Sequence, residues 1–224
     1  MGSAIGQVLP LAVGVALSPL PIIAVVLMLT TPRARTNGPA FVLGWLAGLG
    51  VVGAVVLLVA GPHASSGGSP ATWVSWLKLV LGLGVLVVAV RNVGKRPHGD
   101  EQPEMPKWMG AIDRFGPGRA IGTAAVLAGV NPKNLLLAVA AAAAIAQTGI
   151  PGGQQVVAYL VFAVIGTLGV GLPVVVYLTM GERAPVLLGH LKTWLGRNNA
   201  VILAVLCAVI GVKLVGDAIS GFAG

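Results

Sequence analysis

The sequence predicts an all-α integral membrane protein with six transmembrane helices, arranged as two inverted three-helix repeats. Three observations support this fold class. Of the 224 residues, 56% are hydrophobic and only 9% are charged, whereas soluble domains carry about 25% charged residues. Several apolar runs reach the roughly 20 residues that cross a bilayer. Prolines interrupt the first and the fourth run in a similar sequence context, which predicts two broken spans with their breaks near the midplane.

The apolar runs predict spans at about 5–30, 40–60, 71–90, 121–146, 156–180 and 200–219. Residues 1–90 would form the first repeat, 91–120 a cytoplasmic loop with an interfacial helix, and 121–224 the second repeat. The interfacial helix is expected at 107–115 and a second surface segment at 182–197, because each places its apolar residues on one helical face. Gly44 and Gly48 have the spacing that lets helices approach closely, within one chain or between two.

Basic residues predict the orientation of the chain in the membrane. Eleven of the 14 lysines and arginines fall in connections on one side of the predicted spans, and none falls in the loops of the other side. The eleven are Arg33, Arg35, Arg91, Lys95, Arg96, Lys107, Arg114, Arg119, Arg183, Lys192 and Arg197. Because cytoplasmic loops carry the excess of positive charge, these connections are expected in the cytoplasm of a bacterial cell and both termini outside its inner membrane.

The two broken spans align with each other. Residues 18–21, Ser-Pro-Leu-Pro, correspond to residues 131–134, Asn-Pro-Lys-Asn. Each half contains an odd number of spans, so the halves must be inverted relative to each other in the bilayer. Pro19 and Pro132 would lie about 21 Å and about 17 Å deep from opposite faces, at 1.5 Å per residue, in a hydrocarbon core of about 30 Å. Paired breaks in inverted repeats are typical of a transporter with its site between them.

The candidate substrate-binding residues surround these breaks. Lys133 could bind an anionic group at the midplane, together with the free amides of a broken helix, or it could bind carbonyls and hold the break in shape. Asn131 could orient a ligand or cap its half-helix. The full set of candidates is Ser18, Pro19, Pro21, Asn131, Pro132, Lys133 and Lys78. The three prolines would create the kinks that open a cavity, with Ser18 on the facing wall.

Two further features lie nearer the outer face. Lys78, about 10 Å deep at 1.5 Å per residue, could line an exit path or extend toward the headgroups. Lys213 and Asp217 are four residues apart and are expected to form a local ion pair. No nucleotide-binding, hydrolase or metalloprotease motif is present, so we expect no enzyme activity, no cofactor and no metal site. The net charge of +8 lacks the basic, aromatic-bearing surface of a nucleic-acid-binding protein.

Several segments resemble the lysine-exporter (LysE) superfamily, and more closely its GAP/Sap branch of glycopeptidolipid- and sulfolipid-addressing proteins. The resemblance extends over nearly the whole chain. It is carried by residues 16–24, 41–45, 106–108 with Asp113, 131–137, 181–183, 194–195 and 198–200. It implies an inner-membrane exporter that moves cell-envelope glycolipids outward, while the wider superfamily exports amino acids and other small solutes.

The sequence thus predicts an alternating-access exporter of an amphiphilic or anionic substrate, either an envelope lipid or a small solute. The alternative is a membrane accessory protein that does not transport and instead binds lipid-synthesis or export machinery through its cytoplasmic surface. The expected partners are membrane lipids and the anionic substrate, without nucleic acid. Assembly into a homo-oligomer is left open.

Overall fold

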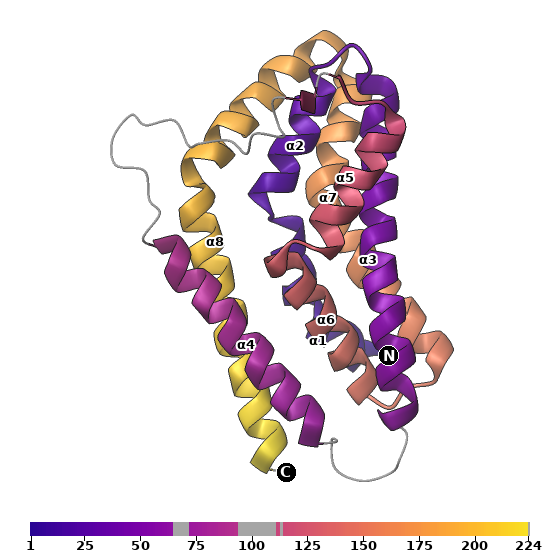
Figure 1. Cartoon of the computed structure of the whole chain (residues 1–224), viewed down its shortest axis with the longest axis vertical. Coiled ribbons are helices and arrows are strands. Elements are labelled where there is room, and N and C mark those ends of the chain that lie inside the picture. The colour runs from indigo at the N-terminus through magenta and orange to yellow at the C-terminus, as the bar shows by residue number, and fades with distance from the viewer. Residues whose placement is uncertain (65–71, 94–110, 113, 224) are drawn as a thin grey trace.

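The protein is a bundle of helices elongated along one axis (Figure 1). The computed structural model describes residues 1–64, 72–93, 111–112 and 114–223. The α-helices are α1 (Gly2–Ala16), α2 (Pro19–Leu29), α3 (Ala34–Ala64), α4 (Thr72–Val93), α5 (Pro117–Gly129), α6 (Pro132–Gln147), α7 (Gly152–Met180) and α8 (Ala184–Ala223). A short 3-10 helix, η2 (Gly181–Arg183), lies between α7 and α8. The described chain contains no strand, as the sequence predicts.

The helix lengths and composition confirm a chain with four to six apolar spans. Helices α3, α4, α7 and α8 are each long and apolar enough to cross a membrane. Two further pairs pass the same test only when taken together: α1 with α2, bent by 51°, and α5 with α6, bent by 66°. These bent pairs are the two runs in which the sequence predicts broken spans.

Proline accounts for the position of both breaks. Pro19 and Pro132 each occupy the first residue of the second half-helix, and Ser18 and Asn131 are the N-cap residues before them. Proline has no backbone N–H and its ring clashes with the preceding turn, so it is favoured at a helix start and can kink or break the helix before it. α1 therefore stops at Ala16, α5 stops at Gly129, and the chain changes direction before each proline.

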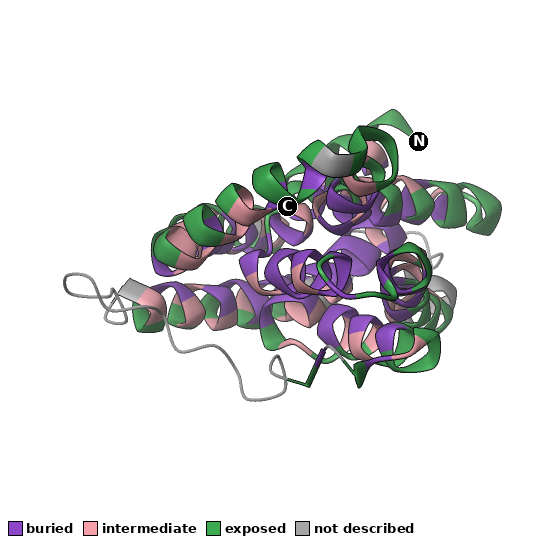
Figure 2. Cartoon of the chain, turned by 90° about the horizontal axis from the view of Figure 1, so that it is seen from above, coloured by how far each residue is buried: buried purple, intermediate pink, exposed green. Residues whose placement is uncertain are grey.

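Six helices (α1, α2, α3, α5, α6 and α7) pack as one group beside the long pair α4 and α8. α3 packs along α5, and α1 packs along both α7 and α6. α4 and α8 run antiparallel against each other on one side of the molecule (Figure 1), where α8 also contacts α2 and α4 also contacts α6. Seen from above in Figure 2, the buried residues face the spaces between helices and the exposed residues cover the outside.

Glycine spacing sets the closest of these contacts. A Cβ atom at Gly44 would overlap the backbone of Ile121, and one at Gly48 would lie 2.6 Å from the carbonyl oxygen of Ala125. Both neighbours belong to α5, so the predicted close approach is confirmed and occurs within one chain. The same device recurs between α7 and α1, where a Cβ atom at Gly169 would overlap the carbonyl of Ala16.

Two predicted surface segments have different outcomes. The expected helix at 107–115 lies mostly outside the described residues, although Ile112 and Phe115 are buried in the core. The segment expected at 182–197 continues directly into the last span, because α8 is one helix of 40 residues. Within it Leu188 and Leu195 are buried, while Trp194 is 56% exposed.

Candidate functional site

The two breaks meet inside the bundle in a network of polar side chains. The ammonium of Lys133 donates one hydrogen bond to the carbonyl oxygen of Gly14 and one to the hydroxyl oxygen of Ser18, each 2.7 Å long. The Ser18 hydroxyl donates in turn to Oδ1 of Asn134, also at 2.7 Å. Ser18, Lys133 and Asn134 are 3%, 5% and 0% exposed. The structure therefore brings the facing wall that the sequence predicts, Ser18, into direct contact with Lys133.

The network satisfies two of the backbone carbonyls that the breaks leave without helical partners. The last carbonyls of any helix have no intrahelical donor. At the end of α1 this leaves Gly14, whose carbonyl accepts from Lys133. At the end of α5 it leaves Leu127, whose carbonyl accepts from Nδ2 of Asn134 at 3.1 Å. Side chains from the first turn of α6 thus cap the C-termini of both interrupted helices.

Lys133 is a buried cation with neutral partners. Its two acceptors are a carbonyl and a hydroxyl oxygen, and an ammonium has three donors. Asp217 is the only acidic residue whose side chain lies in the described part of the chain, and it forms an ion pair with Lys213 at 2.6 Å. Lys133 also lies in the first turn of α6, where the helix dipole disfavours a cation. The C-terminal carbonyl end of α1 offsets part of this cost.

The other candidates near the breaks have defined places. Oδ1 of Asn131 accepts from the backbone N–H of Lys133 at 3.1 Å, so this side chain caps α6. Pro19 and Pro21 are buried at the start of α2, whereas Pro132 is exposed. Pro19 and Pro132 begin the second half-helix at each break. Asn131 is engaged in its capping role in this conformation.

Lys78 is the one candidate that the structure does not bring to the breaks. It lies on α4, 8% exposed, and the charged groups that act on it are Asp217 and Lys213 of α8. No hydrogen bond among the described residues connects Lys78 to the network around Lys133. The expected ion pair of Lys213 with Asp217 is confirmed.

Two participants were not singled out by sequence reasoning. Asn134 belongs to the aligned segment 131–134. It is a polar residue in the first helical turn after Pro132, inside an apolar run, and such a position indicates a candidate site residue. Gly14 contributes only a carbonyl, and no side-chain pattern indicates such a group. Gly14 is also closely packed, since a Cβ atom there would overlap Ile210 and come within 3.1 Å of Leu137. The sequence does not reveal these neighbours, which lie on other helices.

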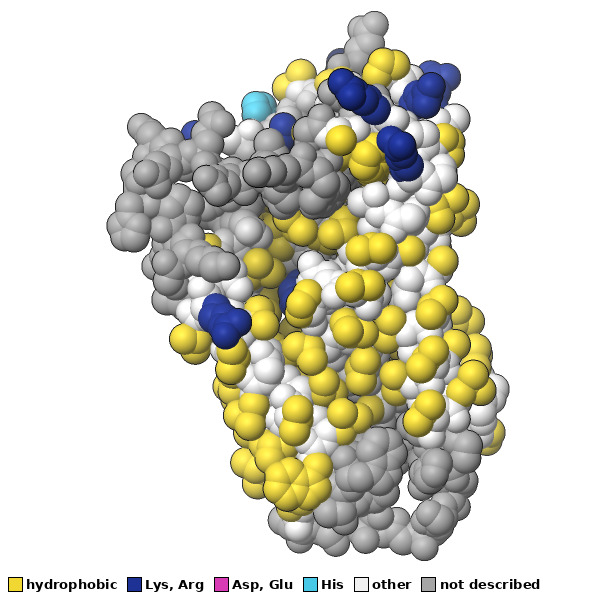
Figure 3. All heavy atoms as spheres, in the orientation of Figure 1, with side chains coloured by type: hydrophobic (Ala, Val, Ile, Leu, Met, Phe, Trp, Pro, Cys, Tyr) yellow, Lys and Arg dark blue, Asp and Glu magenta, His cyan; other side chains and the backbone are white. Residues whose placement is uncertain are grey.

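The surface near the breaks is indented. Figure 3 shows a hollow between the α4–α8 pair and the α5–α6 side of the bundle, with a basic side chain visible inside it. Apolar side chains surround this hollow over most of the drawn face, and basic side chains gather at the upper end of the molecule. Many large apolar side chains are exposed on the outside, among them Leu58 at 76% and Val90 at 73%, as expected where lipid is the solvent.

Long apolar helices, two bent helix pairs and a buried charged network at their junction define an all-helical, multi-pass membrane protein. The chain belongs to the family of Sap, the sulfolipid-1-addressing protein, because the model of that family matches residues 8–220. This confirms the resemblance to the Sap branch. Comparisons with curated proteins and with solved structures each found no match.

Proposed function

We propose that the protein is a non-enzymatic, alternating-access exporter of an anionic amphiphile, and that Lys133 binds the anionic group of the substrate between the two broken spans. The observation that carries this proposal is a buried ammonium held only by neutral oxygen atoms. A buried cation without a counter-ion costs several kcal/mol. A lipid sulfate, phosphate or carboxylate would supply that counter-ion.

The local dipoles favour the same ligand. The N-terminus of α6 starts at Pro132, next to Lys133, and the N-terminus of α2 starts at Pro19. Helix N-termini carry positive partial charge, so they attract anions, even though Pro19 and Pro132 themselves contribute no N–H. An anion that displaced the Gly14 carbonyl from Lys133 would interact with the ammonium and with these helix ends together. The family description adds a chemical class, since it names a sulfolipid.

Inverted repeats would explain how access could alternate. The packing supports a repeat symmetry in which α1 and α2 correspond to α5 and α6, and α3 and α4 correspond to α7 and α8. α3 packs on α5 as α7 packs on α1, and α8 packs on α2 as α4 packs on α6. Transporters with such symmetry move one repeat against the other around a fixed midplane site. In this proposal the basic connections face the cytoplasm of a bacterial inner membrane and both termini lie outside, following the charge asymmetry.

Transport of a tagged lipid by Lys133 variants tests this function. Liposomes containing the full chain and a fluorescent sulfated glycolipid would report outward movement through bleaching by externally added dithionite. We expect Lys133→Met and Lys133→Gln to slow transport at least about tenfold, a loss of ~1.4 kcal/mol of stabilisation. Lys192→Gln, which removes a partly exposed charge on α8, is the matched control and should transport normally.

Stability measurements keep this result interpretable. Lys133→Met removes a buried charge and also leaves the carbonyl oxygen of Gly14 without its donor, which costs about 1–3 kcal/mol, so insertion and melting are measured beside transport for each variant. If a correctly inserted Lys133→Met protein transports the sulfated lipid at the parent rate, Lys133 does not bind the substrate and the proposal is wrong.

One observation favours the accessory function as a second candidate. The first turns of α8 expose a patch of large apolar side chains formed by Val186, Leu187 and Trp194, at 64%, 46% and 56% exposure. These residues lie in the predicted surface segment and could contact either lipid or a partner protein. An accessory protein would lose function with Trp194→Ala and keep it with Lys133→Met, which is the opposite of the exporter's pattern.

A further inference from the structure

A second cluster of charged side chains lies between α4 and α8, away from Lys133. Two close contacts fix the register of this antiparallel pair. Cβ atoms built at Gly82 and Gly211 would each lie within 3.1 Å of the carbonyl oxygen of the other glycine. A Cβ atom built at Gly221 would overlap the hydroxyl of Ser75. This register places Lys78, one turn beyond Ser75, opposite the turn of α8 that precedes Gly221.

The residue in that turn of α8 is Asp217. It already forms the 2.6 Å ion pair with Lys213, and both groups act electrostatically on Lys78. Lys78 is only 8% exposed, and no ion pair or hydrogen bond involves its ammonium among the described residues. Two ammonium groups and one carboxylate therefore lie near one another, and the buried ammonium of Lys78 is the one without an ion-pair partner among the described residues.

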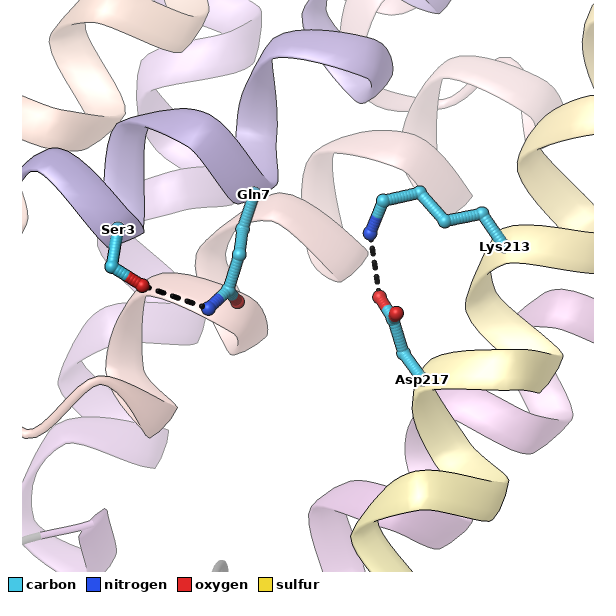
Figure 4. Close-up of polar contacts among 4 residues, drawn as sticks. All are labelled: Ser3, Gln7, Lys213 and Asp217. Carbon is cyan, nitrogen blue, oxygen red and sulfur yellow. Dashed lines mark hydrogen bonds and ion pairs between the residues drawn. The ribbon is translucent and has the colours of Figure 1, made fainter.

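This cluster is open on one side. The side chains of Lys213 and Asp217 are 32% and 36% exposed. In Figure 4 they extend from α8 to the side on which α1 lies, where Gln7 donates a hydrogen bond to Ser3 at 3.4 Å. Lys78 is six residues from the first residue of α4 and Asp217 six from the last residue of α8, a distance of about 9 Å at 1.5 Å per residue. That depth is within reach of a lipid headgroup.

We propose that Lys78, Lys213 and Asp217 form a second anion-binding site, which takes the headgroup of an anionic lipid at the end of the bundle that holds the C-terminus. Lys78 supplies the unpaired charge, and the Lys213–Asp217 pair forms the exposed rim. An anion beside Lys78 would interact with its ammonium more strongly in this low-dielectric environment than the same pair of charges would in water. Zwitterionic lipids carry their own cation and lack this advantage.

The second site is separate from the first. Cys207 of α8 lies near enough to Lys133 to interact with it electrostatically, and Asp217 is ten residues further along the helix, about 15 Å at 1.5 Å per residue. Between these levels the Ile210 side chain packs directly on Gly14, whose carbonyl holds Lys133. If the protein exports lipid, the second site would receive the headgroup after Ile210 moves. Only this ordering rests on the proposed function, whereas the binding itself does not.

Trp76 is a native reporter of lipid at this site. It is 57% exposed, two residues before Lys78, and packs edge-on against Phe222 with 5.2 Å between ring centroids. A full-length variant with Trp73→Phe, Trp108→Phe and Trp194→Phe would retain Trp76 and the fully buried Trp45. In phosphatidylcholine nanodiscs, acyl-brominated phosphatidylglycerol should quench Trp76 at lower mole fraction than acyl-brominated phosphatidylcholine.

The charge variants have opposite expected signs. An ammonium about 10 Å from an anion, at an effective dielectric constant of about 20, changes its affinity on the order of tenfold. Lys78→Gln should therefore abolish the preference for phosphatidylglycerol, whereas Asp217→Asn should keep or increase it. Lys192→Gln, on the distant turns of α8, is the control for net charge and should leave the preference unchanged.

Three outcomes would overturn the second site. The first is equal quenching by both brominated lipids, and the second is an unchanged preference for phosphatidylglycerol in Lys78→Gln. The third is a preference that Asp217→Asn abolishes, because that result would indicate a purely structural cluster. Displacement of the brominated lipid by millimolar inorganic sulfate would overturn the assignment to a lipid. Lys133→Met separates this test from that of the exporter, because it should slow transport at least about tenfold and leave the Trp76 quenching unchanged.

Discussion

Replacing Gly48 by alanine tests the packing that holds the two halves together. The added Cβ atom would lie 2.6 Å from the carbonyl oxygen of Ala125 and 2.9 Å from the Cβ atom of Ala128, well short of the 3.4 Å at which ordinary contact begins. The obstructing atoms are mostly backbone, so α3 and α5 must move apart. Overpacking costs about 1–3 kcal/mol, and the higher helix propensity of alanine returns up to ~1 kcal/mol.

The expected net loss of about 1–2 kcal/mol corresponds to a melting temperature lower by about 2–8 °C in a chain of this size. Thermal unfolding in one detergent, followed by circular dichroism at 222 nm, would measure it. Gly50→Ala is the matched control, because this glycine is on the same helix, is exposed, and has nothing within 4 Å of its Cβ position. A Gly48→Ala protein that melts as high as Gly50→Ala would refute the close α3–α5 contact.

Two hydrogen bonds give further predictions. Ser18→Ala removes the hydroxyl that Lys133 binds, so stability should fall by about 1–3 kcal/mol in the same melting assay, whereas Ser3→Ala on the exposed part of α1 should not change it. Tyr159→Phe removes the 2.8 Å bond from the buried phenol to the carbonyl oxygen of Leu49. It should cost about 1 kcal/mol and leave lipid transport intact, and a lipid-transport defect at unchanged stability would contradict a purely structural role.

Much of the fold follows from composition and proline placement. The length and polarity of the apolar runs predict the spans, since lipid imposes both, and the prolines predict the two bends. The continuity of α8 could not be foreseen in the same way. Asn198 and Asn199 suggest a helix boundary before the last span, because asparagine side chains often hydrogen-bond the nearby backbone in non-helical conformations. In the structure Nδ2 of Asn198 bonds the carbonyl of Trp194 one turn earlier, so the helix continues through both residues.

Helix partners were also not predictable from single-sequence patterns. Apolar faces in a membrane do not indicate their neighbours, because lipid tails and leucine side chains are equally apolar. The Gly44–Gly48 spacing predicts a close contact and does not identify its partner, which the structure shows to be α5. The pairing of α4 with α8, and with it the position of Lys78 opposite Asp217, depends on contacts that only a three-dimensional arrangement provides.

The site shows most clearly what an alignment of the two halves can and cannot predict. Aligning 18–21 with 131–134 makes Gly14 equivalent to Leu127, and these are the two carbonyls that the network caps. The equivalence ends at the donors, because Leu20 and Pro21 stand where the second half has Lys133 and Asn134. Since α2 has no donor in these positions, α6 must supply both caps, and the one charge at the junction comes from one half alone. A midplane site that was symmetric in backbone would therefore be asymmetric in charge, so that an anion would bind to the α6 side and the α2 side could move away from it.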